Sequence, residues 1–156
     1  MRIALYQPDI AGNLGTILRT AACFGVAVDV IEPTGFPWGD RGLARAGMDY
    51  AAAITVSRHV DWEAFLATVD GRIVLATTAG AQPLPQTTFA ASDVLLFGSE
   101  SAGVPQAVHD RADLRVRVPM RPGLRSLNVA ASAAIIAAEA LRQTGGWPDE
   151  QPLQQG

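Results

Sequence analysis

Several residue types that can bind a ligand stand close together near the C-terminal end of the chain. The segment RPGLRSLN, residues 121–128, contains two guanidinium groups, a hydroxyl and an amide. It lies between an alternating stretch, 114–118, and an alanine-rich stretch that ends at Gly145-Gly146. The alternation predicts a strand and the alanine-rich stretch predicts a helix, so the segment is a polar elbow beside free N–H groups, which is typical of a ligand site. The alternative is an ordinary strand, turn and helix with a solvated loop.

Four further observations concern single polar side chains at positions that are unusual for structural residues. Asn13 opens a predicted helix, and Arg19 lies six residues further along it, nearly two turns away. Glu100 stands between glycines after a predicted strand, and Asn128 begins the C-terminal helix. Each has a functional interpretation as part of a site. Each also has a structural one, namely a helix cap for either asparagine, a surface charge for the arginine and a solvated loop acid for the glutamate.

Familiar nucleotide-binding and hydrolase motifs are incomplete. The segment GSESAG, residues 98–103, has the glycine spacing of a phosphate-binding loop, but Val104-Pro105 replaces the Lys-Ser/Thr pair and the chain contains no lysine. No G-x-G-x-x-G follows the first predicted strand, which argues against the usual dinucleotide fingerprint. Ser101 is a near miss to a nucleophile elbow, because Ser99 replaces the required glycine.

The histidines and the single cysteine give no metal or disulfide signal. His59 and His109 flank predicted helices without clustered partners, so we expect both at the surface and no metal site. Cys23 sits in a predicted helix and is expected to be a buried thiol in a reducing compartment, as in a cytoplasmic protein. No apolar run approaches the roughly 20 residues of a membrane span, and the N-terminus lacks a signal-peptide layout.

The charges are few and unevenly placed. Of the 156 residues, 49% are hydrophobic and 17% charged, and the net charge is −3. This composition is that of one compact domain, and its acidic balance argues mildly against a general nucleic-acid binder. Arginines nevertheless crowd two segments in loops at the predicted ligand end, where they can hold phosphates or form only a solvated face. These arginines are Arg41, Arg45, Arg121 and Arg125.

Predicted strands alternate with predicted helices along the chain, and several strands are continuous apolar runs. This pattern is typical of an α/β fold with a parallel sheet covered by helices on both faces, which binds ligands beyond the carboxyl ends of its strands. We expect one domain, 1–146, and a flexible tail, 147–156. The expected strands are 2–6, 26–31, 53–57, 72–77, 93–97 and 114–118, and 79–87 is expected to be loop. The expected helices are 14–24, 41–46, a helix capped by Asp61 that runs to Val69, 105–110, and one that follows Ser126 or Asn128.

Three segments in order resemble the motifs of one enzyme family. NLGTILR from Asn13, LLFGSESAGVP from Leu95 and VPMRPGLRSLNVAASAAI from Val118 are similar to the three motifs of the SpoU branch of the SPOUT RNA methyltransferases. The resemblance runs from Arg2 to about Gly146. The connecting segments IEPTGFPWGDRGLARAGMDY and VSRHVDWEAFL resemble those of the minimal single-domain members, which methylate the tRNA wobble ribose. Three motifs at matching spacing form a strong signal, whereas any one alone is weak.

The resemblance implies a fold and a reaction. The fold is a parallel α/β sheet whose C-terminal part forms a trefoil knot, in a homodimer that would bury the apolar C-terminal helix. The reaction is transfer of a methyl group from S-adenosylmethionine to the ribose 2′-hydroxyl of tRNA at the wobble nucleotide 34, cytidine or a modified uridine, with no metal and no membrane. The implied S-adenosylmethionine positions are Ala76, Thr77, Gly98, Gly103, Val118, Met120, Ser126 and Leu127.

The resemblance also assigns roles on the substrate side. Arg19 would contact the target nucleotide and assist deprotonation of its hydroxyl, although free arginine is too strongly protonated to be an easy base. The two asparagines, Asn13 and Asn128, would orient the ribose, and Glu100 would fix the catalytic loop or Arg19. The arginines expected to contact RNA are Arg41, Arg45, Arg121 and Arg125.

The chain departs from the family pattern in places, and other functions are open. Ser99 and Ala102 stand where proline and arginine are common, and Gly123-Leu124 stands where polar residues are frequent. The alternatives are 2′-O-methylation of another tRNA or rRNA nucleotide and a non-catalytic module that binds S-adenosylmethionine or RNA. A third is a small hydrolase built on Ser101 and His109.

Overall fold

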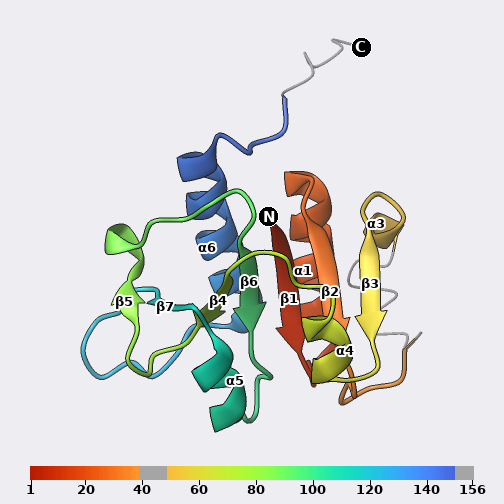
Figure 1. Cartoon of the computed structure of the whole chain (residues 1–156), viewed down its shortest axis with the longest axis horizontal. Helices are drawn as coiled ribbons and strands as arrows, with labels where there is room; N and C mark the ends of the chain where they lie inside the picture. The colour runs from red at the N-terminus through yellow and green to blue at the C-terminus, as the bar shows by residue number, and fades with distance from the viewer. Residues whose placement is uncertain (39–48, 150–156) are drawn as a thin grey trace.

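The computed structural model describes residues 1–38 and 49–149. Its centre is a parallel sheet with the strand order β3-β2-β1-β6-β4-β7-β5 (Figure 1). The strands are β1 (Arg2–Tyr6), β2 (Ala27–Ile31), β3 (Val56–His59), β4 (Ile73–Ala76), β5 (Gln82–Pro83), β6 (Val94–Phe97) and β7 (Leu114–Arg117). The helices are α1 (Ala11–Phe24), α3 (Asp49–Ala51), α4 (Trp62–Leu66), the 3-10 helix η2 (Leu84–Gln86), α5 (Gln106–Arg111) and α6 (Val129–Thr144).

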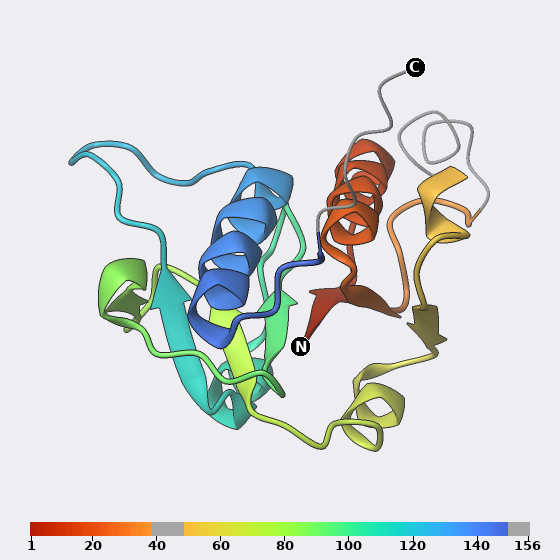
Figure 2. The ribbon, with the colours of Figure 1, turned by 90° about the horizontal axis from the view of Figure 1, so that it is seen from above.

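Helices cover both faces of the sheet. α1 and α6 pack against each other on one face, and α4 and α5 lie on the other (Figure 2). In β6, Leu95 and Phe97 belong to the core beneath α1 and α6, whereas Val94 and Leu96 belong to the core beneath α4 and α5. Successive side chains of one strand therefore fill two separate cores, which is why the strand is apolar throughout. The predicted parallel sheet with helices on both faces is confirmed.

The connection from β7 does not lead to a helix beside β7 but passes over a neighbouring strand to reach α6. β7 pairs with β4 on one side and with β5 on the other. The chain then runs through residues 118–128 to α6, which contacts β6 and α1. Because β4 lies between β7 and β6, this connection passes over β4. The carboxyl ends of β4, β6 and β7 lie around one cavity together with residues 125–128 of the polar elbow.

Both long helices end where the sequence predicts, but the first begins earlier. Gly25 and Gly145 follow α1 and α6 with φ of 67° and 64°, values that glycine adopts without steric cost. α1 begins at Ala11 rather than at residue 14, with Ile10 at its N-cap. Asn13 is therefore not a cap but lies inside the first turn.

Three other boundaries are corrected. β3 covers Val56–His59 instead of 53–57, and α4 ends at Leu66 rather than at Val69, although Asp61 caps it as predicted by accepting a hydrogen bond from Ala64 N. The predicted loop 79–87 contains β5 and η2, because Gln82 and Pro83 pair with β7 at the sheet edge, the place where proline is tolerated in a strand. The predicted helix 41–46 lies outside the described residues.

Two side chains lie differently from the prediction. Cys23 is exposed rather than buried, because the buried residues of α1 lie on its other side, at Leu14, Gly15, Ile17, Leu18 and Ala21. His59, predicted at the surface, is buried, and its Nε2 lies 2.7 Å from Oδ1 of the buried Asp29 on the neighbouring strand. Because β2 is otherwise apolar, the sequence pattern did not indicate that the Asp29 carboxylate is buried and requires a polar partner, which His59 provides.

The chain beyond α6 turns back onto the first helix. Trp147 packs edge-on against Phe24 at the end of α1, with ring centroids 4.9 Å apart. Residues 150–156 lie outside the described part of the chain. Among the described helices, none is both long and apolar enough to cross a membrane.

Candidate active site

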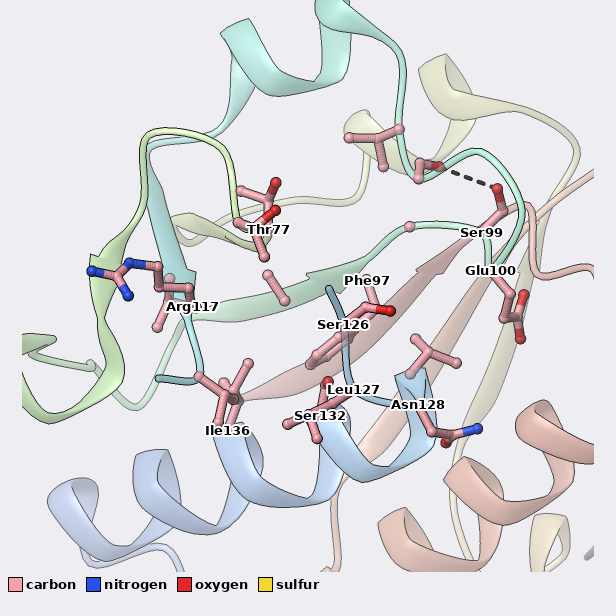
Figure 3. Close-up of a pocket in the computed structure, with 18 of the residues that line it drawn as sticks. Thr77, Phe97, Ser99, Glu100, Arg117, Ser126, Leu127, Asn128, Ser132 and Ile136 are labelled. Atoms are coloured by element: carbon pink, nitrogen blue, oxygen red, sulfur yellow. Dashed lines mark hydrogen bonds between the residues drawn. The ribbon is translucent and has the colours of Figure 1, made fainter. Parts of the chain in front are cut away.

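A cavity of about 610 Å³ opens at the carboxyl ends of β4, β6 and β7. Its walls are the loops that follow these strands and the first turns of α6. Figure 3 shows Thr77 and Glu100 on opposite sides of the cavity, and Ser132 and Ile136 on α6 below them in the view. The volume is within the range of small-molecule sites, about 300–1,000 Å³. The structure brings to this cavity every residue that the sequence assigns to S-adenosylmethionine, namely Ala76, Thr77, Gly98, Gly103, Val118, Met120, Ser126 and Leu127.

The loop from Gly98 to Gly103 is closed on itself. Ser99 and Gly103 exchange two backbone hydrogen bonds of 3.0 and 2.9 Å, and Ser99 Oγ donates to the same Gly103 carbonyl at 3.2 Å. A Cβ atom on Gly98 would lie 2.6 Å from the Gly103 carbonyl carbon, so only glycine fits there. Ser99, which departs from the family pattern, thus has a structural role, because its hydrogen bonds to Gly103 hold the two ends of this loop together.

Three of the four residues predicted to act on the substrate form a hydrogen-bonded relay at one rim of the cavity. Asn13 Nδ2 donates to Glu100 Oε1 at 3.0 Å, and Asn128 Nδ2 donates to Asn13 Oδ1 at 2.9 Å. Asn128 Oδ1 accepts from Ala130 N and Ala131 N at the start of α6, at 2.8 and 3.2 Å. We call this set, Glu100, Asn13 and Asn128, the polar relay. A carboxylate only accepts hydrogen bonds, so the relay has one consistent direction from the helix N-terminus to Glu100.

Arg19 lies away from the relay. It is exposed on α1, with its guanidinium carbon 5.0 Å from the centre of the Tyr50 ring, and it is not among the described residues that line the cavity. Six residues of α-helix separate it from Asn13 by about 240° around the helix axis, which places the two on different faces.

The predicted RNA-binding arginines are only partly described. Arg125 lines the main cavity, and both Arg121 and Arg125 line a second hollow of about 340 Å³ beside it. Both side chains are exposed. Arg41 and Arg45 lie outside the described residues.

Sequence reasoning missed Asp9, which contacts the loop that carries Glu100. Its carboxylate accepts from Glu100 N at 3.1 Å, from Ser101 N at 3.3 Å and from Ser101 Oγ. In return, Asp9 N donates to Glu100 Oε2 at 3.0 Å. A lone acid in the loop QPDIAGN gives no periodic or motif signal, since its partners lie 91 and 92 positions away.

The two carboxyl groups have opposite electrostatic environments. Burial raises the pKa of Glu100, and the neighbouring Asp9 carboxyl raises it further. Hydrogen bonds with Glu100 and Ser101 lower the pKa of Asp9 to about 2. At neutral pH the Asp9 carboxyl is therefore ionised, and of the two groups it is Glu100 whose ionised form is destabilised by its surroundings.

The hydrolase alternative is disfavoured by the geometry. Ser101 Oγ is engaged with Asp9, and His109 lines the cavity from α5 without a hydrogen bond to Ser101 among the described contacts. A nucleophilic serine requires a base within hydrogen-bond reach.

The class of protein follows from comparison with known sequences. A profile of the SpoU rRNA Methylase family matches residues 1–138. The chain belongs to this family, and its α/β fold with a C-terminal trefoil knot, predicted from the sequence, is that of the family.

Individual relatives agree with this assignment. A protein of Beijerinckia indica named tRNA (cytidine(34)-2′-O)-methyltransferase is 54% identical over 146 residues, covering 92% of this chain and 91% of its own. A solved structure described as giving insights into the 2-OH methylation of C/U34 on tRNA is 37% identical, with a TM-score of 0.87 and coverage of 91% and 94%. An AdoMet-bound rRNA methyltransferase from Sinorhizobium meliloti is 30% identical, with a TM-score of 0.82, covering 90% of this chain and 55% of its own.

Proposed function

We propose that this protein transfers a methyl group from S-adenosylmethionine to the ribose 2′-hydroxyl of nucleotide 34 in tRNA, with cytidine as the target base. Relatives that match nearly the whole chain carry this activity in their names. The observation that carries the proposal is the meeting of the polar relay and the eight cofactor positions at one cavity. A binding module without catalysis would need only the second of these sets.

The cavity suits the cofactor in size and in chemistry. Its lining combines apolar side chains, such as Leu127 and Ile136, with the backbone of the closed loop at Gly98 and Gly103. Close backbone approach without side chains suits recognition of a nucleoside through N–H and C=O groups. When bound, S-adenosylmethionine supplies a methyl group already activated by a positively charged sulfur, so positioning of the hydroxyl is the main task of the protein.

In our proposal the polar relay orients that hydroxyl. Each amide nitrogen carries two N–H donors, and the relay uses one on Asn13 and one on Asn128. The second donor of each can contact the ribose oxygens, while Glu100 holds the Asn13 amide in the required orientation. Arg19 lies outside the cavity lining and in our proposal contacts the target nucleotide instead of the cofactor.

The proposal includes a homodimer formed through α1 and α6. One side of α6 is buried within the chain, but Ile135 on its other side remains 41% exposed. Ile10, directly before α1, is 50% exposed. A second copy would remove these side chains from water. Light scattering at micromolar concentration should give twice the chain mass of 16.4 kDa, and a mass near one chain would contradict the dimer.

The decisive test is methyl transfer into tRNA from cells that lack this enzyme. The reaction is run at neutral pH in a buffer with a metal chelator, because the proposed reaction needs no metal. Labelled methyl groups should appear at nucleotide 34 and survive alkaline hydrolysis as a resistant dinucleotide. The matched control is a synthetic anticodon stem-loop with 2′-deoxycytidine at position 34, which should accept nothing. Label at another nucleotide would favour the alternative target, and cofactor binding without transfer to any RNA would favour the binding module.

A further inference from the structure

We propose that Asp9 is a positioning residue for methyl transfer, because it ties the Glu100 loop to the loop after β1 and thereby sets the geometry of the polar relay. This inference rests on the proposed function. Asp9 makes hydrogen bonds through both its carboxylate oxygens and through its own N–H, and all go to Glu100 or Ser101. A side chain that served only as a local turn cap would bond to its own neighbours in sequence.

The contact is reciprocal, so it fixes both backbone and side chain of Glu100. Asp9 Oδ1 accepts from Glu100 N, and Asp9 N donates to Glu100 Oε2. The other carboxylate oxygen, Oε1, is thereby directed to Asn13, whose amide in turn bonds to Asn128. If Asp9 is displaced, the Glu100 carboxylate is no longer held in the orientation that accepts the hydrogen bond from Asn13.

Asp9 is itself held on a rigid support. Gln7 N donates to Ile31 O and Gly35 N donates to Pro8 O, both at 2.9 Å, so the backbone before Asp9 is anchored to β2 and to the loop that follows it. Gln7 has φ of 46°, a conformation that non-glycine residues rarely adopt and that needs such anchoring. A Cβ atom on Gly35 would lie 2.6 Å from Asp9 Cβ and 2.7 Å from its Cα. Asp9 therefore has no room to retreat from Glu100.

Two variants displace this contact in different ways. Asp9→Asn keeps the size of the side chain but loses the charge and one acceptor. Gly35→Ala leaves every hydrogen-bonding group in place and pushes Asp9 by steric contact. Asp61→Asn is the matched control, since the Asp61 side chain also accepts a backbone N–H hydrogen bond, from Ala64 N, but lies at the start of α4 on the opposite face of the sheet from α1 and α6.

The readout is kcat for tRNA methylation across pH at saturating cofactor, with KM for tRNA and the melting temperature of each variant. We expect kcat to fall at least about tenfold in Asp9→Asn and in Gly35→Ala, because small displacements of reacting groups are costly. KM for tRNA should stay within about threefold, since no RNA contact is removed. Asp61→Asn should match the parent.

The pH profile separates positioning from a merely structural role. Glu100 must be ionised to accept from both Asp9 N and Asn13 Nδ2. Among the described residues, Asp9 is the titratable group bonded to Glu100, while Asn13 and Asn128 are neutral. Since Asp9 raises the pKa of Glu100, Asp9→Asn should move the acid limb of kcat to lower pH.

A folded Asp9→Asn variant with kcat within twofold of the parent overturns the inference. So does a loss of kcat that follows the fraction of folded protein while the acid limb stays in place. A parent protein that does not methylate tRNA refutes the proposed function and this inference together, whereas an active parent with an unaffected variant refutes the role of Asp9 alone.

Discussion

Replacing Asn128 with aspartate separates the hydrogen bonds by which this residue caps α6 from the one that we propose to serve catalysis. Asn128 Oδ1 caps α6, while its Nδ2 donates to Asn13. Aspartate keeps the acceptor and places a negative charge at the helix N-terminus, where it is favourable. It has no N–H to donate, so it meets the Asn13 oxygen with a second acceptor. The relay is broken at this point while the helix remains capped.

The expected effects on stability and on turnover differ enough in size to be measured separately. Loss of the cap in Asn128→Ala costs about 1 kcal/mol, which lowers the melting temperature of a domain of this size by about 2–4 °C. Asn128→Asp should melt within about 2 °C of the parent at the same protein concentration. Turnover should fall at least about a hundredfold in both variants, equivalent to roughly 3 kcal/mol in the barrier, because the proposed donor to the ribose is lost and Asn13 loses the hydrogen bond that orients its amide.

The assay is single-turnover methyl transfer to tRNA at saturating cofactor, with calorimetry to show that the cofactor still binds. If Asn128→Asp transfers methyl at the parent rate, the polar relay is not part of the reaction. If activity in the two variants follows their melting temperatures, Asn128 acts only as a helix cap. Both results would refute the reasoning.

Three other predictions concern charged residues. Arg19→Ala should stay folded and bind cofactor normally, since Arg19 lies outside the cavity lining, yet lose at least about a hundredfold in turnover; parent-like turnover would remove Arg19 from the mechanism. Arg121→Ala should weaken tRNA binding and flatten its logarithmic salt dependence by roughly 0.7–0.9, and an unchanged slope would make this arginine a solvated charge. The lowered pKa of Asp9, about 2 in place of 3.8, makes its ionised form stabilising. Its contribution should be complete above about pH 5 and disappear as pH falls towards 2, so urea unfolding of parent and Asp9→Asn should converge in that range; a constant difference would contradict the shift.

The sheet and its ligand end were predictable because they depend on local patterns. Continuous apolar strands such as 94–97 require cover on both faces, and the carboxyl ends of parallel strands must share one edge. Gly98 directly follows β6, so its place at the cavity follows from the sheet alone, whereas Ser126 reaches the cavity through the connection that passes over β4. The helix stops at Gly25 and Gly145 follow from the conformational freedom of glycine.

The remaining contacts were not predictable because they join positions far apart without a periodic signal. Asp29 in β2 and His59 in β3 form a buried pair that neither strand pattern indicates. Asp9 is one acid in an irregular loop, and its function as a support for Glu100 appears only when the two loops meet. The short strand β5 was missed because Pro83 argues against a strand unless the strand is known to lie at an edge.

The span of the polar relay along the chain has a consequence for how the protein matures. Asn13 and Asn128 are 115 positions apart, and closing a loop of that length costs roughly 4 kcal/mol of chain entropy. One hydrogen bond returns only about 1 kcal/mol, so the relay cannot draw its own ends together. The relay therefore depends on the packing of the sheet and α6 to bring Asn13 and Asn128 together. A chain still emerging from the ribosome holds Asn13 from the outset but cannot complete the relay until Asn128 and the C-terminal helix α6 have been released and docked.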